Sequence, residues 1–224
     1  MPWKIIKGII GYYRFPEQKE PWSGAFNGQE HRRKIFFELS QRCRFDAIVE
    51  TGTYRGSTTE LFATMQNIAV YSIESDYWSY GYCLARFWKR SNVKVLLGDS
   101  GETLVALAKN RNFKQPFCYL DAHWGKQIPL RNELNIILET WPQAVVMIDD
   151  FKVKDDPGYG FDEYGDGEQL NVDYIKEIIE AFRPRMFYPR ANSCYETGAR
   201  RGCIVLFGRG DSGSSLALKT LREI

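Results

Sequence analysis

Residues 45–151 alternate short apolar runs with stretches of helical periodicity, and this alternation limits the fold more than any other feature of the sequence. The short runs are bounded by polar or glycine-containing turns, which is typical of buried strands. The predicted strands are residues 46–50, 69–74, 93–99, 117–122 and 144–150. The predicted helices between them are residues 57–67, 77–90, 100–111 and 130–140.

Strands that alternate with helices at this spacing favour a parallel sheet with helices on both faces. Right-handed crossovers then give a doubly wound, Rossmann-like α/β layer. Two later runs, MFYPR and RGCIVLFGR, are predicted to close the sheet, so that it is mostly parallel with a last antiparallel strand. Ligands of such sheets bind outside the carboxyl ends of the strands, which directs attention to the loops there.

The length of 224 residues fits one large domain with additions at its ends. We expect residues 1–44 to form an N-terminal cap segment with an amphipathic helix over residues 27–44. Residues 45–209 would form the main domain, and residues 210–224 a flexible tail. Within the main domain, the Gly-, Asp- and Tyr-rich segment 152–169 is long for a connection and predicts a lid or binding loop.

Composition excludes several classes of protein. Hydrophobic residues at 44% and charged residues at 26% are typical of globular chains rather than disordered ones. No apolar run reaches the ~20 residues that a membrane-spanning helix needs, and the start lacks the long apolar core of a signal peptide. The net charge of +2 does not indicate a nucleic-acid partner, and the five scattered cysteines are typical of reduced thiols. We therefore expect a cytoplasmic protein with neither a nucleic-acid nor a membrane partner.

The loop ETGTYRGST, residues 50–58, joins a predicted strand to a predicted helix. Gly52 and Gly56 allow the backbone to turn tightly and to approach a ligand closely. Their G-x-x-x-G spacing differs from the G-x-G-x-x-G of dinucleotide-binding loops. Glu50, just before the first glycine, could accept hydrogen bonds from an amine on a ligand. The alternative is an ordinary strand-to-helix turn.

Acidic residues end the next two predicted strands. Glu74 follows the glycines by about 20 residues, where a doubly wound fold places a carboxylate against ribose hydroxyls. Asp99 in the sequence GDS could hold an adenine amino group, and Ser100 could cap the next helix. The alternatives are that Glu74 is a solvated acid and that Asp99 only caps the helix.

The glycine loop, the acid in SIESD and the GDS loop together resemble the signature of class I S-adenosylmethionine-dependent methyltransferases, over about residues 45–151. The resemblance implies S-adenosylmethionine as cofactor, with Gly52 near its methionine end, Glu74 on its ribose and Asp99 beside its adenine. The full set of cofactor-binding residues that it implies is Glu50, Gly52, Thr53, Gly56, Ser57, Thr58, Glu74, Asp99, Ser100 and Asp121.

Three further acids follow the fourth and fifth predicted strands: Asp121 in YLDAHWGK, and Asp149 and Asp150 in MIDDF. In the strand order of these methyltransferases the two strands are neighbours, so the three carboxylates would converge. Converging carboxylates either have raised pKa values or surround a cation. Oxygen ligands suit Mg²⁺, Mn²⁺ or Ca²⁺. The alternative is that an aspartate caps the next segment and no metal binds.

The three acids are similar to the metal ligands of the small-molecule O-methyltransferases of the catechol and macrocin types. LDAHWGK also resembles the LDHWK of the catechol type, with one additional residue between Asp and His and another between Trp and Lys. The resemblance implies a divalent cation, with Mg²⁺ favoured, on Asp121, Asp149 and Asp150. His123 is the first candidate for the base because its ordinary pKa lies near neutrality, and Lys126 is the second.

The predicted function is therefore S-adenosylmethionine-dependent, metal-assisted O-methylation of a small hydroxylated acceptor such as a sugar, a phenol or a natural product. The catalytic candidates are His123, Lys126 and Asp121. Aromatic candidates for the acceptor pocket are Trp22, Phe26, Trp124, Tyr159 and Tyr164. The alternatives are a metal-independent methyltransferase, a non-catalytic S-adenosylmethionine-binding domain and a dinucleotide or nucleotide-sugar enzyme. A homodimer stays open, because the leading helix could pack within the chain or against a second subunit.

Overall fold

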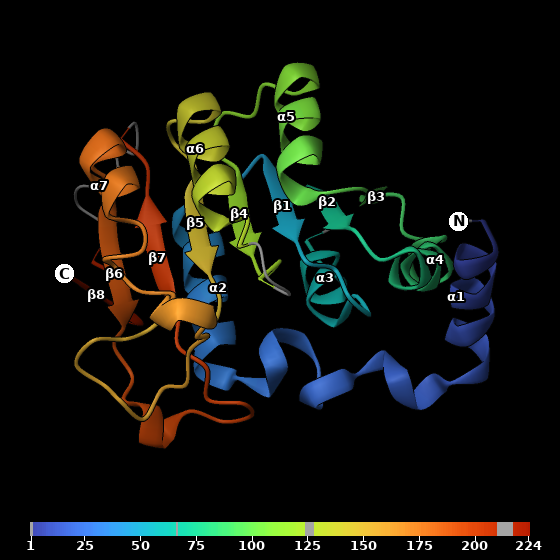
Figure 1. Ribbon diagram of the computed structural model, residues 1–224, viewed down its shortest axis with the longest axis horizontal. Helices are drawn as coiled ribbons and strands as arrows, with labels where there is room; N and C mark the ends of the chain where they lie inside the picture. The colour runs from blue at the N-terminus through green and yellow to red at the C-terminus, as the bar shows by residue number, and fades with distance from the viewer. Residues whose placement is uncertain (1, 66, 124–127, 210–216) are drawn as a thin grey trace.

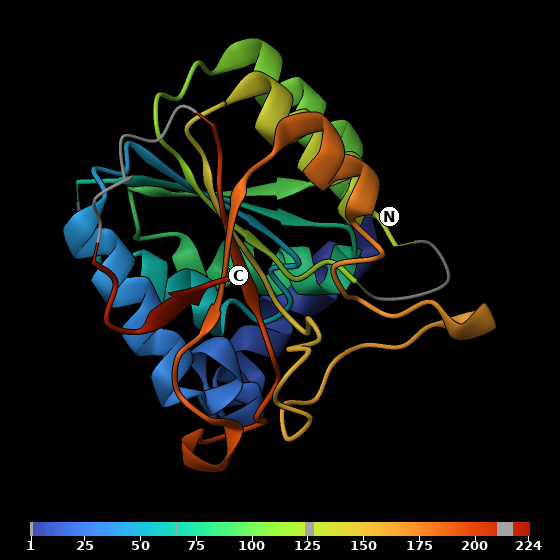
Figure 2. The same ribbon diagram turned by 90° about the vertical axis from the view of Figure 1, so that its left-hand side faces the viewer.

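The computed structural model describes residues 2–65, 67–123, 128–209 and 217–224, and these form one eight-stranded sheet with helices on both faces (Figures 1 and 2). The strands are β1 (Ala47–Thr51), β2 (Ala69–Glu74), β3 (Val93–Leu97), β4 (Phe117–Leu120), β5 (Val145–Ile148), β6 (Arg185–Pro189), β7 (Ile204–Phe207) and β8 (Leu221–Glu223). The α-helices are α1 (Pro2–Arg14), α2 (Glu30–Arg42), α3 (Ser57–Phe62), α4 (Tyr77–Phe87), α5 (Ser100–Asn110), α6 (Leu130–Thr140) and α7 (Lys176–Phe182). Short 3₁₀ helices are η1 (Pro16–Lys19), η2 (Pro21–Ser23), η3 (Ala25–Gly28), η4 (Gly165–Gly167) and η5 (Ser193–Tyr195).

The strand order is β3-β2-β1-β4-β5-β7-β6-β8. Strands β1 to β5 pair in parallel, whereas β7 is antiparallel to both β5 and β6. The order reverses between β1 and β4, and this reversal is where doubly wound sheets bind their ligands. The predicted fold class is therefore confirmed. The predicted bounds of β2 and α6 are also confirmed, and most other elements end within a few residues of their predicted ends.

Apolar side chains fill the space on both faces of the sheet. Helices α5, α6 and α7 lie on one face, and α2 and α3 lie on the other (Figure 2). The amphipathic helix expected in the cap segment is α2, which buries Ile35, Phe36 and Leu39 against the sheet, with Cys43 buried just after its end. This helix therefore packs within its own chain.

The N-terminal helix α1 is an element that the periodicity analysis did not predict. It packs on α4 through glycines: a Cβ atom on Gly8 would lie 2.0 Å from the carbonyl oxygen of Trp78, and one on Gly81 would lie 2.1 Å from that of Ile5. Such distances leave no room for a side chain, so the two backbones meet directly. Within the described residues, no helix is both long and apolar enough to cross a membrane.

The C-terminal residues 217–224 differ from the expected flexible tail. Strand β8 pairs with β6 at the edge of the sheet, and Leu218 and Leu221 are buried against the apolar side chains below it. The segment 152–169, predicted as a lid, is also tied to the domain. Val153 and Tyr159 are buried in the core, and Gly160 forms a bridge with Arg201.

Candidate active site

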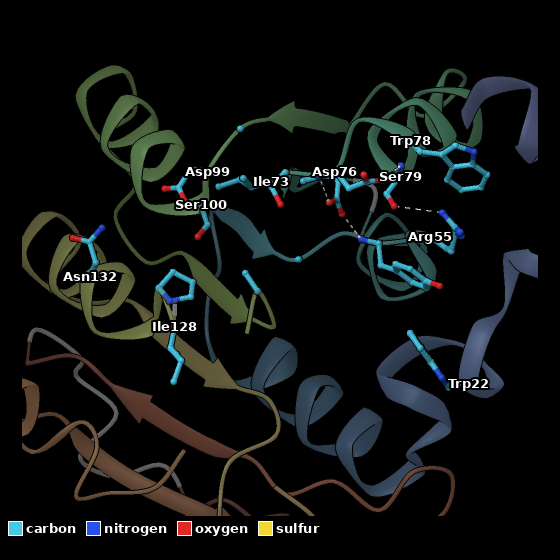
Figure 3. Close-up of a pocket in the computed structure, with 17 residues that line it drawn as sticks. Trp22, Arg55, Ile73, Asp76, Trp78, Ser79, Asp99, Ser100, Ile128 and Asn132 are labelled. Atoms are coloured by element: carbon cyan, nitrogen blue, oxygen red, sulfur yellow. Dashed lines mark hydrogen bonds between the residues drawn. The ribbon is translucent and has the colours of Figure 1, made fainter. Parts of the chain in front are cut away.

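A cavity of about 980 Å³ opens at the carboxyl ends of β1, β2 and β3, with Trp22 and Asn132 on opposite sides of it in Figure 3. This is the place that the doubly wound topology favours for a ligand. The described residues that line it are Trp22, Gly52, Tyr54, Arg55, Ile73, Glu74, Ser75, Asp76, Trp78, Ser79, Gly98, Asp99, Ser100, Ala122, Ile128, Pro129 and Asn132.

Gly52 forms the turn that leaves β1. Its φ of +85° lies in the left-handed region, and a Cβ atom would stand 2.3 Å from the backbone oxygen of Asp121. Only glycine therefore lets the β1 loop pass directly against the end of β4. Gly56 has a different role, because a Cβ atom there would meet the ring of Phe87 at 2.6 Å, outside the cavity. The first glycine shapes the site and the second lets α3 pack on α4.

Glu74 ends β2 with its side chain against the cavity. Its two carboxylate oxygens accept the backbone N–H groups of Tyr54 and Asp76, each at 2.7 Å. Burial raises the pKa of Glu74, and these N–H donors oppose the rise. Each oxygen keeps a further lone pair. The carboxylate is thus fixed in position and can still accept from two neighbouring hydroxyls of a ligand.

Asp99 is the N-cap of α5 and Ser100 is the first residue of the helix, so the cap is Asp99 and not Ser100 as predicted. Both residues line the same cavity (Figure 3). The Asp99 carboxylate accepts the backbone N–H of Glu102 at 3.1 Å, so it caps the helix as well as facing the cavity. The cap on α5 is therefore confirmed, and the contact of Asp99 with adenine stays a prediction. Glu133 of α6 is fully buried, and burial raises its pKa to about 7.

Several residues predicted to bind the cofactor do not line the cavity, and instead form hydrogen bonds beneath the β1 loop. Glu50 is buried and accepts the hydroxyls of Thr59 and Ser72, each at 2.5 Å, and burial raises its pKa to about 7. The hydroxyls of Thr53 and Ser72 lie 2.6 Å apart. Thr58 accepts the backbone N–H of Phe26. Ser57 is the first residue of α3. These contacts hold β1, β2 and α3 together around the turn.

Residues of the cavity wall that sequence reasoning missed include Tyr54, Arg55, Trp78 and Asn132. Tyr54 stacks on Trp22 with ring centroids 5.0 Å apart, and the guanidinium carbon of Arg55 lies 3.7 Å from the Trp78 ring centroid. Tyr54 and Arg55 stand between the two glycines, so the position of the glycine loop could have indicated them. No sequence pattern indicated Asn132, because it comes from α6, a helix after β4. Among the predicted acceptor aromatics, Trp22 lines the cavity, whereas Phe26 is fully buried.

Beyond the cavity, β4 and β5 pair in parallel, and their carboxyl ends bring Asp121, Asp149 and Asp150 together. Asp149 is fully buried and forms an ion pair with Arg32 of α2. It also accepts the Tyr119 hydroxyl and, at 2.7 Å, the backbone N–H of Asp150. Burial opposes ionisation, but the Arg32 guanidinium and these donors hold the pKa of Asp149 below its ordinary value.

Asp150 has a φ of +53° and pairs with Arg201, whose Nε donates to it at 2.6 Å. Arg201 also pairs with Asp162 of the 152–169 segment. Burial and the charge of Asp149 raise the pKa of Asp150 to about 7. Burial and the other two aspartates raise the pKa of Asp121 well above its ordinary range. The expected repulsion among the three acids is therefore present.

The residues of this cluster do not fit the predicted divalent cation. The Asp149 carboxylate already has three donors, and Asp150 is held by Arg201. In the described ranges no group of three or more His, Cys, Asp or Glu side chains is arranged to hold a metal. Two arginines supply positive charge at the place where the sequence predicts a metal ion. Asp149 and Asp150 are thus paired with arginines, and the metal site predicted on Asp121, Asp149 and Asp150 is not found among the described residues.

His123 is buried just after β4, and its backbone oxygen accepts the Tyr164 hydroxyl at 2.7 Å. Neither ring nitrogen has a hydrogen-bond partner among the residues that the structure describes. Burial lowers the pKa of His123 to about 4, so the imidazole is neutral at pH 7. The other predicted base, Lys126, and the aromatic candidate Trp124 lie outside the described residues.

No protein-family model matches the chain, and no curated protein matches it in sequence. Solved structures do match it. A Klebsiella pneumoniae protein described as an O-methyltransferase aligns with a TM-score of 0.57 and 14% identity, over 92% of this chain and 89% of its own. The O-methyltransferase of Bacillus cereus in complex with S-adenosylhomocysteine aligns with a TM-score of 0.55 and 18% identity, over 80% of this chain and 81% of its own. The methyltransferase domain of bacterial CtHen1-CN aligns with a TM-score of 0.56 and 12% identity, over 80% of this chain and 98% of its own. The chain therefore has the fold of the class I S-adenosylmethionine-dependent methyltransferases.

Proposed function

We propose that this chain is an S-adenosylmethionine-dependent methyltransferase that methylates a hydroxyl group of a small acceptor without a bound metal ion. The observation that carries the proposal is the order of groups around the cavity. Gly52, Glu74 and the Asp99–Ser100 pair stand at the carboxyl ends of β1, β2 and β3 in turn. The fold alone does not bring such groups together, because they belong to loops that vary between proteins of one fold.

The donors and acceptors of this wall fit the cofactor. Glu74, fixed by two backbone N–H groups, would accept both ribose hydroxyls. Asp99 and Ser100 would face the adenine, and the turn at Gly52 would let the backbone lie close to the methionine end. When bound, the cofactor supplies a methyl group activated on a sulfonium sulfur. The stacked pair Trp22 and Tyr54 at the cavity offers an aromatic surface to a ring or a sugar face.

The acceptor hydroxyl must lose a proton to a base, and Asp150, which follows β5 outside the cavity lining, is one candidate. Its pKa of about 7 is close to the working pH, which favours general-base catalysis. Arg201 orients its carboxylate at 2.6 Å. His123, with a pKa near 4, is the weaker base. A pH profile of methyl transfer distinguishes them. With Asp150 as base the rate rises through about pH 7, and with His123 it is flat above about pH 5.

Titration calorimetry with S-adenosylhomocysteine tests the proposed function. We expect micromolar binding by the wild type and at least tenfold weaker binding by Glu74→Ala. The matched control is Glu102→Ala, an exposed glutamate of α5 outside the cavity lining, which should bind like the wild type. Wild-type binding of NAD in place of S-adenosylhomocysteine would favour the dinucleotide alternative. Binding of neither ligand would contradict the proposal.

A further inference from the structure

Helix α1 exposes an apolar stripe on the side that faces away from α4. Residues 3, 6, 10 and 13 recur at spacings of three and four, so they share one face of the helix. Their side chains are exposed by 62% at Trp3, 45% at Ile6, 51% at Ile10 and 65% at Tyr13. Surface helices of globular proteins normally carry polar residues on this face. The stripe is therefore an unpartnered apolar surface at the β3 edge of the fold (Figure 1).

The inner face of α1 fixes the stripe where it is. Gly8 and Gly81 let α1 and α4 meet backbone to backbone, and Gly11 lies against the Trp78 ring. A Cβ atom on any of the three would come within 2.5 Å of the other helix. Ile5, Ile9 and Tyr12 turn toward the protein and are half-buried. Because the glycines require this face to point inward, the helix cannot rotate to bury Trp3 or Ile10.

The charged side chains of α1 itself all have one sign. Residues 1–16 contain Lys4, Lys7 and Arg14 and no acidic residue. Lys7 holds its ammonium 5.3 Å from the centroid of the Trp3 ring, beside the stripe. A second copy of this chain that docked face to face would bring these like charges together, which disfavours a symmetric dimer. The surface instead complements a partner that is both apolar and negatively charged.

We propose that α1 docks this chain on the surface of an anionic lipid bilayer. A helix of 13 residues is ~20 Å long, too short to span the apolar core, so it would lie in the plane of the interface. The apolar stripe would enter the boundary between headgroups and acyl chains, and the lysines would contact anionic headgroups. No membrane partner is expected from the sequence, because no apolar run is long enough to span a bilayer. A helix that lies in the interface needs no such run.

Vesicle co-sedimentation of the full chain tests this proposal without any cofactor, so its result is independent of the proposed function. The probes are vesicles of phosphatidylcholine alone and of phosphatidylcholine mixed with phosphatidylglycerol. We expect the wild type to sediment with the mixed vesicles, to bind the neutral ones at least tenfold more weakly, and to be released as salt is raised.

Two double variants test the two parts of the surface and keep residues that favour helix. Trp3→Gln with Ile10→Gln removes apolar area, and Lys4→Gln with Lys7→Gln removes charge. Each should lower the partition coefficient at least tenfold. The matched controls Tyr195→Ser and Val105→Ser change exposed apolar residues on η5 and α5, and should bind like the wild type. Far-ultraviolet circular dichroism verifies that every variant is folded.

Three outcomes would overturn the proposal. The wild type would stay in the supernatant with both kinds of vesicle, or the stripe variants would bind as the wild type does. In the third, the wild type would be a dimer by light scattering that Trp3→Gln with Ile10→Gln converts to a monomer, without vesicle binding. That result would assign the stripe to a second copy of the chain.

Discussion

The two ends of the candidate active-site region differ in the partners that bind their carboxylates. At the β1–β3 end, Glu74 and Asp99 accept backbone N–H groups from residues two or three positions away, besides the N–H of Tyr54. At the β4–β5 end, Asp149 and Asp150 are held by arginines 117 and 51 residues away. The first end is organised locally and keeps free acceptors toward a cavity. The second is organised by distant partners that neutralise its charge.

This difference teaches which parts of a site a motif can define. A carboxylate whose partners are its own neighbours has the same environment wherever the motif occurs. A carboxylate cluster has an environment set by whatever the rest of the chain places beside it. Here the sequence of the β4–β5 acids resembles a metal site, whereas in the structure two arginines form ion pairs with two of these acids.

The largest effect should come from breaking the buried pair at the β4–β5 end. Arg32→Ala leaves Asp149 buried and unpaired, which should lower the free energy of unfolding by about 3–5 kcal/mol. Arg222→Ala is the control, because its partner Asp155 is largely exposed and such pairs contribute at most about 1 kcal/mol. Urea unfolding measures both. Equal losses in the two variants would show that Arg32 does not neutralise a buried charge.

Glu133, buried near the cavity, should make stability depend on pH. Its pKa is about 7 in the folded chain and near 4.5 when unfolded, so the folded state keeps a proton that the unfolded state loses. The free energy of unfolding should therefore fall by up to about 3 kcal/mol as pH rises from about 4.5 to 7. Glu133→Gln removes this contribution, so the variant should gain on the wild type across that window. A difference that stays constant between pH 5 and pH 8 would contradict the assignment.

A methyl group at the first glycine should damage the turn where the β1 loop passes against the end of β4. Gly52→Ala places a Cβ atom against the backbone oxygen of Asp121 at a positive φ, and should weaken S-adenosylhomocysteine binding at least tenfold, or about 1.4 kcal/mol. Gly165→Ala is the matched control, because nothing lies within 4 Å of its added methyl. Calorimetry gives both affinities. A Gly52→Ala variant that binds normally would mean that the ligand does not approach this turn.

The smallest expected effect is that of a divalent cation. Because Arg32 and Arg201 already pair with Asp149 and Asp150, millimolar MgCl₂ should leave the thermal midpoint of unfolding where EDTA leaves it. Differential scanning calorimetry in the two buffers makes the comparison. A midpoint that rises with MgCl₂ in the wild type, and not in Asp150→Asn, would restore the metal site.

Local patterns predicted the fold well. The alternation of strands and helices gave the parallel sheet, and the position of Glu74 after the glycines gave the wall of the cavity. The burial of Arg32 was not predicted, because this residue stands in a basic run, EHRRK, that is typical of a solvated helix face. Its burial depends on where α2 lies against β5, which no local pattern contains. Strand β8 was not predicted for the same reason, since its three residues form a strand only by pairing with the edge of β6.

A crystal structure of the protein grown with S-adenosylhomocysteine and MnCl₂ would test the account most directly, since manganese is located by its anomalous signal. We predict that the ligand lies at the carboxyl ends of β1, β2 and β3 with its ribose hydroxyls on Glu74. Arg32 and Arg201 should still pair with Asp149 and Asp150, and no anomalous peak should lie among the three aspartates. A manganese ion ligated by Asp121, Asp149 and Asp150, with the arginines displaced, would contradict the account.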